Sequence, residues 1–264
     1  MSGWRRRAVA GVIVLTVAVP FIPLLLWSIS ERWFFPEPWP RQWGLRAWGY
    51  VAGTAGGQIT AGLLESFSLA AVTSAVSLAA GIPAGRALGL YEFPGKDLAS
   101  VLITLPVIVP PLSVAMGLHL WFIRLGLAET FVGVVLVHLT FCLPYSVFVM
   151  WGVFSNYNPE FEDQARSLGA SGTRVVWKVM LPMIWPGVVV AGLFSFLLSW
   201  AQYLSTLIIG GGRLLTLPIL LFSLMGSGDR PVAAAVSLVF VAPAFLVLLL
   251  SARYLGRHGL AGVR

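Results

Sequence analysis

The stretch that decides the fold runs from Glu160 to Pro182 and reads EFEDQARSLGASGTRVVWKVMLP. It is the longest polar interval between two strongly apolar segments in the C-terminal half of the chain. Acidic side chains fill its first turn, where they complement a helix dipole, and Gly169 stands where a helix commonly ends. The pattern predicts a short polar surface helix, a glycine break, and a second amphipathic stretch that ends at Leu181–Pro182.

The composition on either side of this interval is that of a membrane protein. Of the 264 residues, 58% are hydrophobic and 10% are charged, whereas a soluble domain carries about 25% charged residues. A soluble fold could not bury so much apolar side chain, so we expect an all-α integral membrane protein. The single cysteine, Cys142, cannot form an intrachain disulfide. No polar segment has the size of a soluble domain, so residues 1–264 are expected to form one transmembrane domain.

Six apolar segments are long enough to cross a bilayer. They cover residues 8–29, 59–88, 98–122, 129–154, 183–208 and 232–250, and the polar interval 155–182 lies between the fourth and the fifth. The first follows three arginines but is too long for a signal peptide and lacks a small-residue cleavage site, so we expect an uncleaved span. Pro20 and Pro23 predict a kink there, and Pro106, Pro110 and Pro111 predict a bent third span inside a bundle.

Two further segments are expected at the outer face. Residues 31–58 are rich in Trp, Phe (Phe35 among them) and Pro, which favours the bilayer interface; a buried aromatic cluster is the alternative. The other is 210–231, where residues 219–225 predict a short helix. Its triple glycine, 210–212, indicates a turn, with an anion-binding nest as the alternative.

The distribution of Lys and Arg indicates the orientation. With six spans and both termini on one side, eleven of the 17 basic residues fall on that side and six on the other. The positive-inside rule then places both termini, Arg264 included, and the interval 155–182 in the cytoplasm. The net charge of +7 is accordingly interpreted as membrane topology and not as a nucleic-acid-binding surface.

The polar interval resembles the EAA signature of the membrane subunits of binding-protein-dependent ABC importers. That signature is Glu-Ala-Ala, three residues, Gly, nine residues, Ile, one residue and Leu-Pro. Its spacing is intact here, with Asp in place of Glu, Gln in place of the first Ala and Val in place of Ile. The matched positions are Asp163, Gln164, Ala165, Gly169, Val179, Leu181 and Pro182. The alternative is an ordinary cytosolic loop between two spans.

The resemblance extends over residues 63–257 and is strongest to the permeases of the polyamine, ferric iron and thiamine importers. The other motifs that carry it are Phe93-Pro-Gly-Lys96, Leu105-Pro-x-x-x-Pro-Pro111 and Thr216-Leu-Pro218. It implies a type I ABC importer permease in the plasma (inner) membrane of a prokaryote. The implied partners are a second permease subunit, identical or a sibling, two ATP-binding cassette ATPase subunits and an extracytoplasmic solute-binding protein. A polyamine-like solute is the first expectation, with ferric iron, thiamine or another small solute as alternatives.

The chain itself shows no catalytic motif. The phosphate-binding loop Gly-x-x-x-x-Gly-Lys-Ser/Thr is missing, since Gly95-Lys96 is followed by Asp97, and there is no zinc-binding pattern. We therefore expect no catalytic residue, metal or cofactor on this chain, with ATP and Mg on the partner ATPase. Charged residues are nearly absent from the spans, which argues against a proton-driven pump. A passive channel or facilitator is the alternative class, and a membrane-embedded enzyme would need a catalytic set that is not found.

The resemblance implies that the polar interval docks on the ATPase and transmits its motion to the spans. The residues expected to form this coupling site are Glu162, Asp163, Gln164, Ala165, Arg166, Leu168, Gly169, Leu181 and Pro182. Arg174 and Lys178 are either partner contacts or inner-leaflet anchors.

The solute pathway is expected between two copies of such a subunit. The candidate residues, at the end of the fifth span, are Ser199, Gln202, Tyr203, Ser205 and Thr206. Hydrogen bonding between helices is the alternative for each of them. His138, in the fourth span, is expected to hydrogen-bond a neighbouring helix, with a proton relay as the alternative.

Overall fold

The computed structural model describes residues 3–34 and 36–259. The expectations for Phe35, for residues 1–2 and for residues 260–264, Arg264 among them, lie outside this part of the chain.

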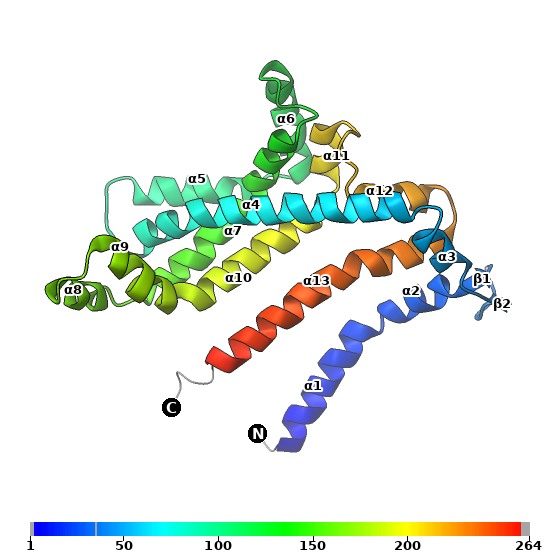
Figure 1. Ribbon diagram of the computed structural model, residues 1–264, viewed down its shortest axis with the longest axis horizontal. Coiled ribbons are helices and arrows are strands. Elements are labelled where there is room, and N and C mark those ends of the chain that lie inside the picture. The colour runs from blue at the N-terminus through cyan, green and yellow to red at the C-terminus, as the bar shows by residue number, and fades with distance from the viewer. Residues whose placement is uncertain (1–2, 35, 260–264) are drawn as a thin grey trace. The chain divides into compact units, whose positions relative to one another are not determined.

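The described residues are mostly helical (Figure 1). The elements of the first half are α1 (Gly3–Ala18), α2 (Phe21–Ser28), β1 (Ser30–Arg32), β2 (Gln42–Trp43), α3 (Arg46–Ala52), α4 (Gly56–Leu90), α5 (Lys96–Ile108) and α6 (Pro111–Arg124). Those of the second half are α7 (Phe131–Ser155), α8 (Glu160–Ser167), α9 (Gly172–Val175), the π-helix η1 (Val176–Met180), α10 (Leu181–Trp200), α11 (Leu204–Gly210), α12 (Leu217–Gly226) and α13 (Arg230–Gly259).

Two compact units make up the chain. The first holds Met1–Leu64 and Leu215–Pro243, and the second holds Glu65–Leu214 and Ala244–Arg264. The boundaries fall within α4 and α13 and in the loop before α12.

Within the described residues, four helical runs are long and apolar enough to cross a membrane: α4, α7, Gly172–Trp200 and Arg230–Ser251. The predicted third span is instead two helices, α5 and α6, bent by 102° at their break. Val109 and Pro110 are both extended there, and Pro111 begins α6, because a proline pair disfavours helical backbone before it. The predicted first span is likewise divided into α1 and α2 at 19–20. The count of six membrane crossings stays a prediction.

The predicted fifth segment, 183–208, is also divided. Its helix α10 ends at Trp200, and α11 begins at Leu204. Hydroxyls of Ser205 and Thr206 bond the side chain and the carbonyl of Gln202, so local polar contacts compete with continuous helix here.

The core of the second unit is built around α7, which packs against α10, α6, α11 and α5. Three buried hydroxyls, from Ser77 of α4, Ser146 of α7 and Ser195 of α10, bond one another at 2.7–3.3 Å. They satisfy one another inside the protein, as interhelical polar groups in membrane proteins do.

Close packing of α4 on α7 depends on three glycines spaced four apart. A Cβ built on Gly81, Gly85 or Gly89 would lie 2.5–2.7 Å from the Cβ of the α7 residue it faces. Such a small-residue stripe lets two backbones approach closely. It brings the C-terminal end of α4 beside the end of α7, from which the polar interval leaves.

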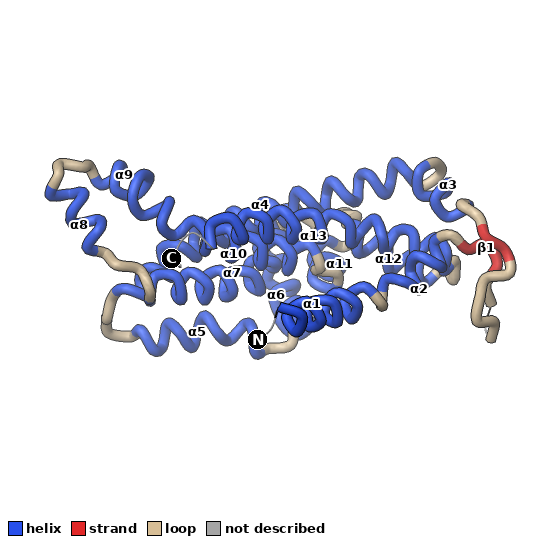
Figure 2. Tube along the Cα trace, turned by 90° about the horizontal axis from the view of Figure 1, so that it is seen from below, coloured by secondary structure: helices blue, strands red, loops and turns tan. Residues whose placement is uncertain are grey.

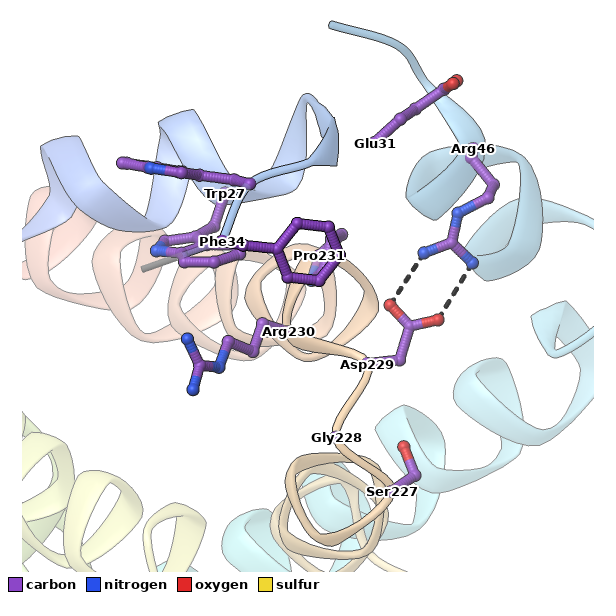
Figure 3. Close-up of a pocket in the computed structure, with 10 residues that line it drawn as sticks. Trp27, Glu31, Phe34, Arg46, Ser227, Gly228, Asp229, Arg230 and Pro231 are labelled. Carbon is purple, nitrogen blue, oxygen red and sulfur yellow. Dashed lines mark hydrogen bonds and ion pairs between the residues drawn. The ribbon is translucent and has the colours of Figure 1, made fainter. Parts of the chain in front are cut away.

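In the first unit, an ion pair connects α3 to the residue that precedes α13. The Arg46 guanidinium donates two hydrogen bonds of 2.9 Å to the Asp229 carboxylate (Figure 3). This pair holds the pKa of the Asp229 carboxyl below its ordinary value. Nearby, the ring of Trp27 stacks on that of Trp33 at 4.5 Å, and the Arg230 guanidinium lies 5.5 Å from the Trp27 ring centre.

Most aromatic side chains of 31–58 are exposed, including Phe34, Trp39 and Trp43, so the buried-cluster alternative does not hold for them. A short antiparallel pair, β1 with β2, crosses this segment and adds a little strand to a chain predicted to be all-α. The short helix predicted at 219–225 is confirmed as α12, and the turn predicted at 210–212 is confirmed, since Gly211 and Gly212 have positive φ.

Candidate functional site

Helix α8 lies at the ends of α7 and α10 and is set off by loops on both sides (Figure 2). The Asn158 side chain accepts a hydrogen bond from the Glu160 N–H at 3.0 Å, which satisfies one free donor of the first turn. Gly169 has a φ of +83°, and the N–H groups of Gly169 and Ala170 donate back to the carbonyls of Arg166 and Ala165. This is the Schellman end of a helix, so the predicted glycine break is confirmed.

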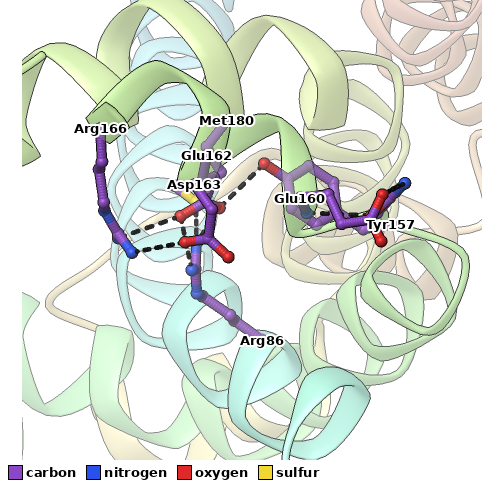
Figure 4. A network of polar contacts seen from close by, with 8 residues as sticks. Arg86, Tyr157, Glu160, Glu162, Asp163, Arg166 and Met180 are labelled. Atoms are coloured by element: carbon purple, nitrogen blue, oxygen red, sulfur yellow. Dashed lines mark hydrogen bonds and ion pairs between the residues drawn. The ribbon is translucent and has the colours of Figure 1, made fainter. Parts of the chain in front are cut away.

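Glu162 points into the protein (Figure 4). Its side chain is 3% exposed, and its two carboxylate oxygens accept hydrogen bonds from Arg86 Nη1 at 2.8 Å and Nη2 at 2.9 Å. The Tyr157 hydroxyl donates to the same carboxylate at 2.9 Å, and Arg166 approaches at 3.4 Å. Glu162 was expected at the partner contact, but the structure buries its carboxylate inside the chain.

The surroundings of Glu162 stabilise its ionised form. Hydrogen bonds from Arg86 lower the pKa of the Glu162 carboxyl below its ordinary value of 4.5, although burial opposes this shift. Burial, together with the bond to Glu162, raises the pKa of the Tyr157 hydroxyl to about 12. At neutral pH the carboxylate is therefore charged and the tyrosine remains a hydrogen-bond donor.

Arg86 is held by more than its ion pair. Its guanidinium lies 5.8 Å from the centre of the Phe154 ring, a distance typical of a cation–π contact. It also contacts the sulfur of Met180, the last residue of η1. Short π-helical segments often lie at functional sites, and this one connects the polar interval directly to α10.

The outward side of α8 carries the other predicted residues. Asp163, Gln164 and Leu168 are exposed and line a shallow hollow with Glu160 and Ser167. Leu168 is 89% exposed, so its apolar side chain is open to solvent beside the hollow.

The remaining residues predicted for the coupling site do not line this hollow. Ala165 is half-buried, and Arg166 is exposed but bonds inward to Glu162. Leu181 and Pro182 lie at the start of α10 and do not line the hollow. Arg174 and Lys178 are both exposed.

The residues predicted to line the solute pathway are buried or half-buried, and most of them form hydrogen bonds within the protein. His138, 1% exposed, bridges two of them, with its Nδ1 2.8 Å from Ser199 Oγ and its Nε2 2.9 Å from Thr206 Oγ1. Ser199, Ser205 and Thr206 are buried, and Gln202 and Tyr203 are half-buried. The interhelical alternative therefore describes Ser199 and Thr206, and it confirms the expected hydrogen-bonding role of His138.

Sequence reasoning missed Arg86, Tyr157 and Met180 as parts of this site. From the sequence, Arg86 is only one of the eleven basic residues predicted on the cytoplasmic side, and nothing in its local sequence indicates its partner Glu162. Across the described residues, no group of three or more His, Cys, Asp or Glu is placed to hold a metal ion.

Helices that are long and apolar enough to cross a membrane define the chain as an integral membrane protein. The chain belongs to the family of binding-protein-dependent transport system inner membrane components, whose profile matches residues 81–258. The resemblance to ABC importer permeases is thereby confirmed, and with it the type I permease fold and a place in the inner membrane.

Two relatives illustrate the range of this family. The chain is 32% identical over 259 residues to the molybdenum transport system permease protein ModB of Mycobacterium tuberculosis, covering 92% of this chain and 90% of the relative. It is 27% identical over 188 residues to the spermidine/putrescine transport system permease protein PotC of Haemophilus influenzae, covering 71% and 73%.

Among solved structures, a bacterial ABC transporter that imports the acidic polysaccharide alginate matches with a TM-score of 0.73. The match has 18% identity and covers 96% of this chain and 95% of that one. At this identity the match establishes the fold alone.

Proposed function

We propose that this permease forms half of a solute pathway and that α8 docks on a cytoplasmic ATPase that drives import. The observation that carries the proposal is the two-sided build of α8. Its inner side is fixed by the buried Glu162 carboxylate, and its outer side presents Asp163, Gln164 and the exposed Leu168. A short rigid helix with one anchored side and one free apolar anchor point suits insertion into a groove of a partner.

The proposed assembly contains a second permease subunit, identical or a sibling, two ATP-binding cassette subunits that carry ATP and Mg, and an extracytoplasmic solute-binding protein. A related solved structure is an alginate transporter in complex with an alginate-bound periplasmic protein, which supports the binding-protein partner. In this proposal both termini and α8 lie in the cytoplasm, and lipid covers the exposed apolar helix faces. The chain itself is proposed to be non-catalytic.

Two solutes are proposed for testing. A polyamine-like cation follows from the likeness to the spermidine/putrescine permease. An oxyanion such as molybdate is favoured by the more complete match to the molybdenum permease. Uptake of labelled spermidine and of molybdate into proteoliposomes of the full complex would separate the two.

The docking test is a cysteine crosslink in a Cys142→Ser background. Leu168→Cys is paired with cysteines in the facing groove of the ATPase, and the complex is oxidised in membranes with and without ATP. We expect a crosslink that depends on nucleotide. The matched control is Glu92→Cys, whose side chain is 90% exposed in the loop between α4 and α5, and which should not react.

Absence of any Leu168 crosslink, with both proteins folded and present, would contradict docking. Solute flux that needs no ATP would then favour the passive facilitator. Substitution of Gly169 by valine provides a second discriminator, since a β-branched residue is strained at its positive φ. Coupled transport should collapse in this variant, whereas a passive pore should be indifferent.

A further inference from the structure

We propose that Glu162 is a positioning residue which, with Arg86, ties α8 to α4, so that movement of α8 reaches α4 directly as well as along the chain to α10. This inference rests on the proposed docking of α8 and assigns the transmission step to named residues.

The Glu162 carboxylate has no capacity left for an outside partner. Its Oε1 accepts from Arg86 and Tyr157, and its Oε2 accepts from Arg86 and Arg166. A carboxylate offers about four lone-pair sites, and all are taken within the chain. The sequence predicts Glu162 at the docking surface, but its carboxylate is hydrogen-bonded inside the chain.

The Arg86–Glu162 contact resists rotation as well as separation. Two N–H···O bonds of 2.8 and 2.9 Å join both terminal guanidinium nitrogens to both carboxylate oxygens, and such a bidentate pair restricts the relative orientation of the two groups more than a single charge contact does. Because successive residues in an α-helix are turned by about 100°, Gln164 lies about 200° around the helix from Glu162, so Glu162 faces inward while Gln164 faces outward. A force that the partner applies to the outer side of α8 is therefore transmitted to Glu162, whose carboxylate is held on the inner side of the same helix.

Besides α8, which carries Glu162, four segments meet at this pair. Arg86 belongs to α4, Phe154 to the end of α7, Tyr157 to the loop before α8, and Met180 to η1 just before α10. Next to Arg86, Gly85 brings the α4 backbone against α7. If the pair is broken, α8 keeps its contacts with α9 and η1 but loses its ionic link to α4, and its flanking loops, 156–159 and 168–171, would then act as hinges.

The test is an intrachain distance measured by electron paramagnetic resonance in the assembled complex with its ATPase. Nitroxide labels are placed at Phe161→Cys on α8, outside the docking hollow, and at Glu92→Cys after α4, in a Cys142→Ser background. In this parent chain we expect the same distance with Mg-ATP and without nucleotide, because the two helices move together. In Arg86→Gln and in Glu162→Gln we expect the distance to shift or broaden when ATP binds.

Two further variants separate positioning from mere folding. The exchange of the pair, Arg86→Glu with Glu162→Arg, should restore at least part of the parent behaviour, and Tyr157→Phe, which keeps both Arg86 bonds, should broaden the distribution less than Arg86→Gln. The matched control is Arg174→Gln, which removes an exposed guanidinium from the same interval without touching Glu162 and should leave the distance unchanged.

A nucleotide-dependent change in the parent distance itself would overturn the proposal without requiring any substitution in the pair. So would parent-like distances in Arg86→Gln and Glu162→Gln chains that still assemble. The Leu168 crosslink, repeated in each variant, keeps the two proposals apart. If it is missing in the parent chain, docking fails; if it forms while the distances do not respond to the substitutions, only the tie between α8 and α4 fails.

Discussion

Replacing Gly85 by alanine should weaken the packing of α4 on α7. The new Cβ would lie 2.5 Å from the Cβ of Met150, 2.7 Å from its carbonyl carbon and 2.8 Å from the nitrogen of Trp151, whereas ordinary contact begins at 3.4 Å. Two of these three atoms belong to the backbone and cannot rotate away, so the helices must separate. Overpacking of this kind costs about 1–3 kcal/mol, and the better helix propensity of alanine offsets about 0.5–1 kcal/mol.

The expected net loss is therefore about 0–2.5 kcal/mol in the free energy of unfolding. It is measured by reversible unfolding of the purified chain in mixed detergent micelles. The matched control is Gly152→Ala on α7, where an added Cβ meets nothing within 4 Å and should leave stability equal or slightly higher. Equal stabilities for the two variants would refute the close approach of α4 and α7, and with it the placement of Arg86 beside α8.

Three further predictions concern the charged and polar contacts. Because the pKa of the Glu162 carboxyl is lowered, the stabilising contribution of this carboxylate should be complete above pH 4.5, its ordinary pKa, and lost as the pH falls through the lowered pKa. The free energy of unfolding, measured from neutral pH downward, should show this loss, and its dependence on pH should be weaker in Arg86→Gln. His138→Phe removes two buried hydrogen bonds of about 0.5–1.5 kcal/mol each, so thermal unfolding in detergent should reveal a loss of about 1–3 kcal/mol. Asp229→Asn breaks a pair with Arg46 that is half exposed on the arginine side, so the same assay should show a change of only about 0–1 kcal/mol.

The helical class and the main helices could be predicted because they depend on local composition. The apolar segments 129–154 and 59–88 lie within two residues of α7 and within three of α4, since a continuous apolar run is itself the signal for a membrane-length helix. The breaks were harder to place. The proline pair at 110–111 signalled a bend, but the size of that bend depends on how the carbonyls freed by the prolines are satisfied by neighbouring helices, which local sequence does not specify.

The inward direction of Glu162 could not be predicted from the polar interval itself. Three acids crowd the first turn of α8, and the helix dipole favours all of them equally. What distinguishes Glu162 is Arg86, which lies 76 residues earlier in the chain. That partner is brought into place by glycines on α4, whose role becomes visible only once α7 is packed against them.

Adjacent residues of the EAA-like stretch therefore have different physical tasks. Under the proposed docking, the departures from the signature at Asp163 and Gln164 fall on the outward side, where they alter the reach and charge of the surface offered to the ATPase. On the inner side, Glu162 is a glutamate whose carboxylate is hydrogen-bonded within the chain. Substitutions on the outer side of α8 can therefore change how it fits a particular ATPase without weakening the Arg86–Glu162 contact. This is because the residues of the outer side and those of the inner side contact different partners.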